Sequence, residues 1–369
     1  MRVIIQANSA VINHELVDSL WVEVDRGKIA ALSPGLHPAP HTVLTGTLIP
    51  GFIDIHCHGG GGHYFSASSD DEIRAVISTH RALGTTGVMA SLVTESIEDL
   101  KQQIRRLVPF FHRNEIIGVH LEGPYLSHAQ CGAHEPSLLR EPDLEQIKEL
   151  LVVGDGAIAM ITMAPELRGA QEAITYIISQ GVKVAMGHTN ADFKEAAAGA
   201  NAGATVVTHF MNAMNKELSS DSFSAFILAD ERLMPELILD GHHLSFAVAR
   251  DILETIGSRC MLISDAMAAA GSIDGDYTIG KLPVIVQEGV ARLAHNKRLA
   301  GSTLSISQAF INAIEHCGIS LVDAVALSST NPAKAISITD RGSIAVGMRA
   351  DLLDYDSARQ TLTVVNLSG

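Results

Sequence analysis

The sequence predicts an α/β protein: a (β/α)8 TIM-type barrel with a small β-sandwich domain built from both chain termini. Three observations support this prediction. The middle of the chain alternates short apolar runs with longer amphipathic stretches, which is typical of a parallel α/β fold. Eight such apolar runs can be counted, enough to close a barrel. Both chain ends instead carry short strand-like runs broken by turn residues.

The elements of the barrel follow in chain order. The eight runs expected to be strands are Leu48–Ile55, Gly87–Val93, Ile116–Leu121, Ile158–Met163, Val182–Met186, Thr205–Thr208, Glu236–Leu239 and Cys260–Ser264. The amphipathic stretches expected to be helices include Asp70–Leu83, Ile97–Phe111, Leu144–Val152, Gln171–Gln180 and Phe246–Ile256. A doubly wound open sheet would show the same alternation and is the alternative to a barrel.

The two chain ends are expected to form one small domain. Short strands are predicted at 2–6, 20–24, 29–32, 342–344, 351–355 and 361–365. These positions place the small β domain at 1–48 and 338–369, and the catalytic barrel at 49–337.

The composition limits the classes of function. Apolar residues make up 47% of the chain and charged residues 18%, so a large buried core is expected. A formal net charge of −15 argues against nucleic acid as the main partner, because that role needs a basic surface. The sequence shows neither a signal-peptide pattern nor the ~18–20 apolar residues of a membrane span. The four cysteines lack CxxC spacing, which suits free thiols and a cytoplasmic protein.

Residues that bind metals or transfer protons lie at the ends of several predicted strands. They are His56 and His58 at the first, Glu122 at the third, His188 at the fifth, His209 at the sixth and Asp265 at the eighth. The C-terminal strand ends of a barrel meet on one face, so these residues are expected to share a pocket. Taken singly, each has a structural explanation as a cap, a turn residue or a core histidine. Other histidines are expected to be solvated: His14, His37, His41, His80, His112, His128, His295 and His316.

This set of side chains suits a divalent metal ion. Imidazole and carboxylate ligands favour zinc over iron or manganese. Glu122, His188 and His209 would supply three protein ligands and leave one coordination position open, as catalytic sites do. His56 and His58 would hold a second ion.

Asp265 is the expected acid–base group. It would take a proton from an attacking water and deliver it to the leaving nitrogen. An amide nitrogen departs poorly unless it is protonated, so this arrangement fits hydrolysis of an amide-type bond.

A series of motifs runs along nearly the whole chain. In order they are PGFIDIHCHG, HLEGPYLS followed by GAH, GHT, THFMNAM, DGHH, ISDA and LAGSTL. In this series the chain resembles the N-acetylglucosamine-6-phosphate deacetylases of the amidohydrolase superfamily. The resemblance implies a barrel with a small β domain from both termini, an amino-sugar phosphate as substrate, and a homodimer.

The resemblance also implies roles for individual residues. The metal ligands and the acid–base group would be those named above. His134 would help to polarise the acetyl carbonyl, and His243 would contact the sugar phosphate. Asn212 and Ala213 would meet the substrate.

The chain departs from this family at one position. Family members usually carry an arginine after the NAM motif, which contacts phosphate and commonly comes from the neighbouring subunit. The segment here is NKELSSDS, at 215–222, and the aligned position is Ser220. Lysine does not reproduce the two-pronged contact of arginine with phosphate. Three alternatives stay open: Lys216 binds the phosphate, the substrate lacks one, or the phosphate lies elsewhere.

The function expected is hydrolysis of the N-acetyl amide of an amino-sugar phosphate, most simply N-acetylglucosamine 6-phosphate. A related N-acetyl-hexosamine, of another epimer or without phosphate, is one alternative. Hydrolysis of a cyclic amide is another, and a catalytically inactive protein that binds sugar phosphate is a third.

Overall fold

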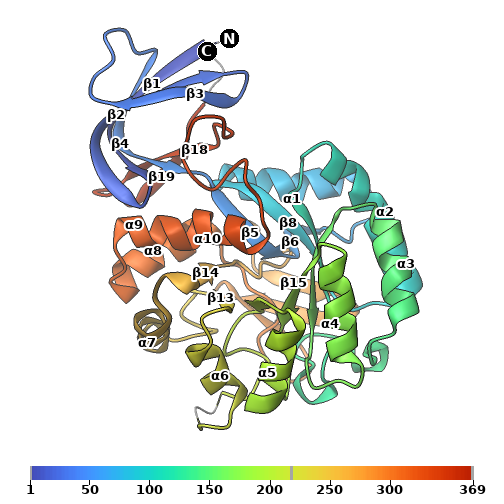
Figure 1. Cartoon of the computed structure of the whole chain (residues 1–369). Coiled ribbons are helices and arrows are strands. Elements are labelled where there is room, and N and C mark those ends of the chain that lie inside the picture. The colour runs from blue at the N-terminus through green and yellow to red at the C-terminus, as the bar shows by residue number, and fades with distance from the viewer. Residues whose placement is uncertain (1, 217–218, 367–369) are drawn as a thin grey trace.

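The computed structural model describes residues 2–216 and 219–366. Its centre is an eight-stranded parallel sheet in which the strands follow chain order around the barrel (Figure 1). The strands are β5 (Phe52–Cys57), β8 (Thr85–Leu92), β9 (Gly118–Glu122), β10 (Ile158–Met163), β11 (Lys183–Met186), β12 (Val206–Val207), β13 (Met234–Leu237) and β14 (Met261–Leu262). These strands overlap the eight predicted runs, so the predicted barrel is confirmed.

The barrel closes between its first and last strands, just beyond β14. The backbone N–H of Asp265 donates to the carbonyl of His56 at 2.9 Å, and Cys57 forms a parallel bridge with Ala266. This seam excludes the open sheet that the alternation alone would allow.

The buried Asp54 carboxylate also links the first and last strands of the barrel. The Ser264 hydroxyl donates to Asp54 Oδ2 at 2.5 Å, and the backbone N–H of Ser264 donates to Oδ1 at 3.3 Å. The backbone N–H of His56 donates to the same Oδ1 at 3.2 Å. The side chains of Asp54 and Ser264 thus hold together the strands that carry His56 and Asp265.

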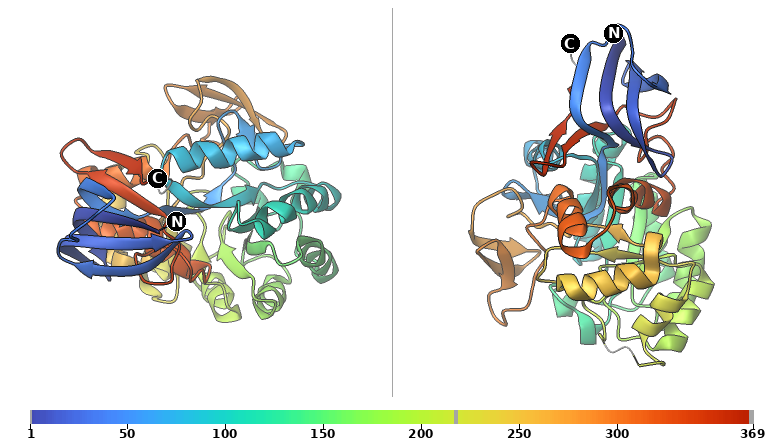
Figure 2. Two further views of the ribbon diagram at one scale, coloured as in Figure 1. Left: turned by 90° about the horizontal axis from the view of Figure 1, so that it is seen from above. Right: turned by 90° about the vertical axis from the view of Figure 1, so that its left-hand side faces the viewer.

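Helices surround the barrel, as the view from above shows (Figure 2). They are α1 (Asp70–Ala82), α2 (Ile97–His112), α3 (Leu144–Gly154), α4 (Ala170–Ser179), α5 (Phe193–Ala202), α6 (Phe223–Ala229), α7 (Phe246–Ile256), α8 (Ile306–Cys317), α9 (Leu321–Val325) and α10 (Asn331–Ala335). A π-helical turn, Ala326–Thr330, joins the last two. Short 3-10 turns lie at His128–Gln130, Pro136–Leu138 and Gly257–Arg259.

The helix boundaries follow from local sequence signals. Ser69 and Glu72 form a capping box at the start of α1, in which each side chain accepts from the other residue's backbone N–H. Helix α2 buries Ile97, Leu100 and Ile104, which repeat at the helical period and face the barrel.

Both chain ends meet in one six-stranded sheet, which confirms the predicted small β domain built from both termini. Its order is β19-β18-β4-β1-β2-β3. The strands are β1 (Arg2–Ile12), β2 (Glu15–Asp25), β3 (Lys28–Pro34), β4 (Thr42–Pro50), β18 (Leu352–Asp356) and β19 (Thr361–Val364). The sheet lies at one end of the barrel (Figure 1). The division at 48/49 and 337/338 stays a prediction.

Two local predictions are wrong. The run Leu48–Ile55 is not one strand: β4 ends at Pro50 in the small sheet, and β5 begins at Phe52 in the barrel. The residue at this break must be a glycine, because a Cβ on Gly51 would lie 2.2 Å from the Thr86 hydroxyl oxygen. The segment 342–344 is not a strand, because Gly342 accepts a hydrogen bond from the Thr330 hydroxyl at 2.8 Å and packs against α10.

The sequence reasoning did not anticipate a three-stranded antiparallel sheet after β14. Its strands are β15 (Gly275–Ile279), β16 (Leu282–Gln287) and β17 (Val290–Leu293), and it projects from the side of the barrel (Figure 2). Inward residues such as Ile279 and Val284 pack on Met267, close to the end of β14. A shorter hairpin pairs β6 (Gly59–Gly60) with β7 (His63–Tyr64).

Among the described helices, none combines the length and apolar character of a bilayer span. The longest, α2, has 16 residues and two acidic residues in its first turn.

We expect Ser264→Ala to lower the free energy of unfolding by about 1–3 kcal/mol, because it removes a donor from the buried Asp54 carboxylate. Urea denaturation measures the change. Ser357→Ala, in the exposed turn after β18, is the control and should stay within about 0.5 kcal/mol of the parent. Equal stability of the two variants would contradict the role given to this hydrogen bond.

Candidate active site

The predicted strand-end residues come together at the C-terminal face of the barrel. Glu122 is the last residue of β9, and His188, His209 and Asp265 follow β11, β12 and β14 within three residues. The latter three have positive φ, at 47°, 28° and 49°. Such a backbone conformation is costly for residues with a side chain and often marks a functional site. Here it turns each side chain toward the barrel axis.

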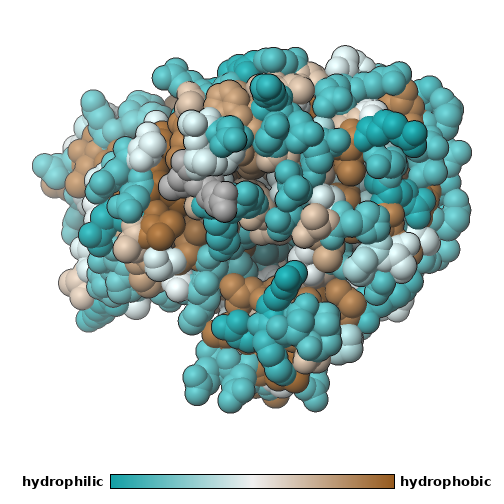
Figure 3. All heavy atoms as spheres, turned by 90° about the horizontal axis from the view of Figure 1, so that it is seen from below, coloured by the Kyte–Doolittle hydropathy of each residue, from teal (hydrophilic) through white to brown (hydrophobic). Residues whose placement is uncertain are grey.

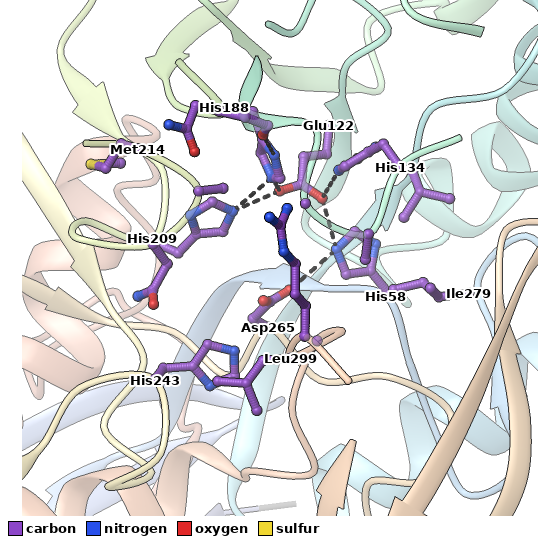
Figure 4. Close-up of a pocket in the computed structure, with 18 of the residues that line it drawn as sticks. His58, Glu122, His134, His188, His209, Met214, His243, Asp265, Ile279 and Leu299 are labelled. Atoms are coloured by element: carbon purple, nitrogen blue, oxygen red, sulfur yellow. Dashed lines mark hydrogen bonds and ion pairs between the residues drawn. The ribbon is translucent and has the colours of Figure 1, made fainter. Parts of the chain in front are cut away.

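Glu122 lies at the centre of the cluster, and four histidines point toward it (Figure 4): His58, His134, His188 and His209. Its Oε1 lies 3.1 Å from Nε2 of His188 and 3.1 Å from Nε2 of His209. Its Oε2 lies 3.2 Å from Nε2 of His58 and 3.3 Å from Nε2 of His134. Burial alone would raise the pKa of Glu122, but His56 and His134 hold it well below the usual value.

A second group adjoins the first. Nε2 of His56 lies 3.2 Å from Nε2 of His58, and Asp265 Oδ1 lies 3.4 Å from the latter nitrogen. Burial would raise the pKa of Asp265, but the hydrogen bond from His58 and the charge of His56 lower it to about 2. Asp265 is therefore a carboxylate able to accept a proton.

Hydrogen bonds behind the cluster fix the proton positions of two histidines. Nδ1 of His188 lies 2.9 Å from the carbonyl oxygen of Gln130, which can only accept. Nδ1 of His56 lies 3.0 Å from a Glu236 carboxylate oxygen. Each Nδ1 therefore carries the proton, and in the neutral ring the lone pair of Nε2 faces the site.

This donor set fits a metal ion. Nε2 of His188 and Nε2 of His209 lie only 3.0 Å apart, so lone pairs and carboxylate oxygens concentrate where a cation would relieve their repulsion. Ligand atoms of Glu122, His134 and His188 lie within 4.8 Å of one another, as do those of His56, His58 and Asp265 in the adjoining group. These two candidate metal-binding clusters face the site, and Asp54, Cys57 and His80 form a third such group among the described residues.

His134 has the opposite proton arrangement. The backbone N–H of Thr94 donates to Nδ1 of His134 at 3.2 Å, so Nδ1 is an acceptor. Burial and the neighbouring His188 lower the pKa of His134 to about 4. The neutral ring therefore carries its proton on Nε2, which faces the site and can donate to an oxygen there.

Two contributors were missed by sequence reasoning. Glu236 on β13 is fully buried, and its Oε2 accepts from the backbone N–H of His209 at 3.1 Å as well as from His56. The sequence did carry a signal for Glu236, because a glutamate inside an otherwise apolar predicted strand is unusual. The sequence carries no such signal for Thr94, because it holds His134 through its backbone N–H, which does not depend on the residue type.

The prediction that His80 is solvated is wrong. His80 is fully buried, and its Nε2 lies 3.1 Å from Cys57 Sγ and 2.9 Å from the carbonyl oxygen of Gly59. Helix α1 turns it inward on the face that packs against β8, where a solvated side chain has no room.

The cluster forms one end of a cavity of about 460 Å³. Figure 3 views the molecule from the end opposite the small sheet and shows a hollow near the middle of this face. The expected substrate residues all line the cavity: Asn212, Ala213, Lys216 and His243. Nδ1 of His243 lies 2.7 Å from Asp240 Oδ2, which fixes the ring.

The segment after the NAM motif is only partly described. Ser220 is exposed and is not among the residues lining the cavity, whereas Lys216, also exposed, lines it. Desolvation lowers the pKa of Lys216. Glu217 and Leu218 lie outside the described residues.

The family model of the amidohydrolase family matches residues 47–366. The chain belongs to the amidohydrolase family. Two curated proteins illustrate its relatives within this family. An N-acetylglucosamine-6-phosphate deacetylase of Bacillus subtilis (strain 168) is 30% identical over 96% of this chain and 93% of its own length. An N-acetylgalactosamine-6-phosphate deacetylase of Escherichia coli O157:H7 is 30% identical over 97% of this chain and 96% of its own.

Solved structures of amidohydrolases agree with this placement. The N-acetyl-D-glucosamine-6-phosphate deacetylase of Mycobacterium smegmatis, solved as a mutant in complex with N-acetyl-D-glucosamine-6-phosphate, is 40% identical. It superimposes with a TM-score of 0.96 over 99% of this chain and 98% of that one.

We expect Glu236→Gln to weaken the affinity for a divalent metal about 10- to 100-fold, because it removes the charge that keeps the His56 proton on Nδ1. Competition with a chelator measures the affinity. The control is Glu231→Gln, an exposed change of the same chemistry. Unchanged metal affinity in Glu236→Gln would show that this contact does not orient the ligand.

Proposed function

We propose that this amidohydrolase hydrolyses the N-acetyl amide of N-acetylglucosamine 6-phosphate and releases acetate and glucosamine 6-phosphate. The observation that carries the proposal is the single pocket in which Glu122, His188 and His209 face both Asp265 and His134. The close similarity to an enzyme solved with this amino-sugar phosphate supports it.

Zinc is the ion we propose for the site. Glu122, His188 and His209 would hold the principal ion, and His56 and His58 a second. When bound, zinc would polarise the carbonyl and lower the pKa of a water to about 7. The bare Nε2 nitrogens and the carboxylate suit this ion.

The protein groups carry the proton transfers. Asp265, held as a carboxylate, accepts a proton from the water that attacks the acetyl carbon. His134 donates its Nε2 proton as a hydrogen bond to the carbonyl oxygen, where negative charge develops. Asp265 then returns its proton to the amide nitrogen as the C–N bond breaks, so acetate and the free amine leave.

The substrate-binding roles follow the shape of the cavity. Asn212 and Ala213 line it, and His243 lies beyond Asp265 as seen from Glu122 (Figure 4). The acetyl group would lie at Asp265, with the sugar extending toward His243.

A second candidate is the galactose epimer. The relative from Escherichia coli O157:H7 carries the name of an N-acetylgalactosamine-6-phosphate deacetylase and covers this chain as fully as the other relatives. Comparing the rates on N-acetylglucosamine, N-acetylgalactosamine and their 6-phosphates distinguishes the epimers.

We also propose a homodimer located in the cytoplasm. The family resemblance supports the dimer, and the four free thiols suit a reducing compartment. Gel filtration with light scattering tests the assembly.

Removal of the metal should abolish acetate release from N-acetylglucosamine 6-phosphate, because the attacking water would lose its activation. Adding zinc back to the chelated protein should restore the rate, which an acetate assay coupled to metal analysis would follow. Full activity of a thoroughly chelated sample would refute the proposed mechanism.

Asp265→Asn should reduce kcat about 10²- to 10⁴-fold with little change in metal content, because the amide cannot accept the proton. Steady-state kinetics and metal analysis on one preparation measure both. Asp276→Asn, exposed on β15, is the control and should keep the parent rate. A small effect of Asp265→Asn would mean that another group moves the proton.

A further inference from the structure

The cavity needs a cation for a phosphate group, because the protein is strongly acidic. The net charge is −15, so its general field repels an anionic substrate. The acidic residues that line the cavity, Glu122 and Asp265, both belong to the metal clusters. Lys216 and Arg298 are the lysine and arginine side chains among the described residues that line it.

We propose that Arg298 of the same subunit binds the 6-phosphate, in place of the arginine that is absent at Ser220. This inference rests on the proposed function. It explains how an acidic protein without an arginine at position 220 would bind a phosphorylated sugar.

The backbone brings Arg298 to the cavity. The Leu293 N–H donates to the Arg298 carbonyl at 2.8 Å, and the Arg298 N–H donates to Asn296 Oδ1 at 3.0 Å, which closes a tight turn after β17. Three residues later, a Cβ on Gly301 would lie 3.1 Å from the carbonyl oxygen of Asp265. Three residues span at most about 10 Å, so the Arg298 backbone stays close to the backbone of Asp265, and its side chain lines the same cavity.

The turn that carries Arg298 lies on the side of the pocket where the phosphate is expected. The C2 and C6 substituents of a hexose are well separated on the ring, so an amide at Asp265 places the phosphate away from Glu122. Figure 4 shows His243 and Leu299, the residue after Arg298, beyond Asp265 on that side. The phosphate would therefore meet His243 and the turn that carries Arg298.

The guanidinium is free for this contact. Within 2–216 and 219–366, no carboxylate lies at ion-pair distance from Arg298. His243 already uses Nδ1 on Asp240 and has one nitrogen to offer. A guanidinium provides two parallel N–H donors that match two phosphate oxygens.

Lys216 is a weaker candidate for this role. Desolvation lowers its pKa and so disfavours its charged form. An ammonium group also lacks the paired donors of a guanidinium.

Arg298→Gln tests the inference, with Lys297→Gln as the matched control. Lys297 is the preceding residue and is equally exposed, but it lines a separate groove with His242 and Arg292. Both variants change the net charge by one unit, so a general field effect would move them together.

Arg298→Gln should raise the KM for N-acetylglucosamine 6-phosphate roughly 10- to 100-fold, with kcat little changed. The kinetics on N-acetylglucosamine should not change, and Arg298→Lys should recover part of the loss. Lys297→Gln should retain the parent KM.

Two results would overturn the inference: a parent-like KM in Arg298→Gln, or an equal loss on both sugars. A phosphate-specific loss in Lys216→Gln alone would assign the role to that lysine instead. These outcomes differ from failure of the proposed function, in which the parent protein itself would release no acetate or would show no preference for the phosphorylated sugar.

Discussion

The buried carboxylate of Glu122 is the constraint on which the rest of this structure depends. A negative charge at 3% exposure is very costly unless positive or hydrogen-bonding groups surround it. Here five imidazoles of the described residues face its two oxygens, and they come from four different segments of the barrel face. These segments meet only when the barrel closes in the observed register. The same strand pairing therefore forms the barrel and assembles the site.

The groups behind the cluster are as informative as those facing it. Carbonyl and carboxylate acceptors hold the protons of His188 and His56 on Nδ1, whereas a backbone N–H holds that of His134 on Nε2. Similar side chains in one pocket thereby become lone-pair donors or a proton donor. These partners therefore decide which ring nitrogen faces the site with a lone pair that could bind a metal ion and which faces it with a proton to donate.

The charge distribution is uneven in a way that suits the proposed substrate. The acidic groups that line the cavity belong to the candidate metal-binding clusters, and its lysine and arginine side chains are not at ion-pair distance from an acid among the described residues. An amide at one end and an anionic group at the other would match this gradient. These cations provide a local positive region for an anion in a strongly negative molecule.

The sequence by itself determined the approximate positions of the eight barrel strands, five of the helices and the residues at the strand ends, because apolar periodicity and strand-end position are local properties. It could not place Glu236 behind His56, Thr94 behind His134 or His80 in the core. Those contacts join residues separated by 23 to 180 positions, and they depend on register and on the rotation of helices against the barrel. The turn that brings Arg298 to the cavity belongs to a sheet whose packing on Met267 only the tertiary structure decides.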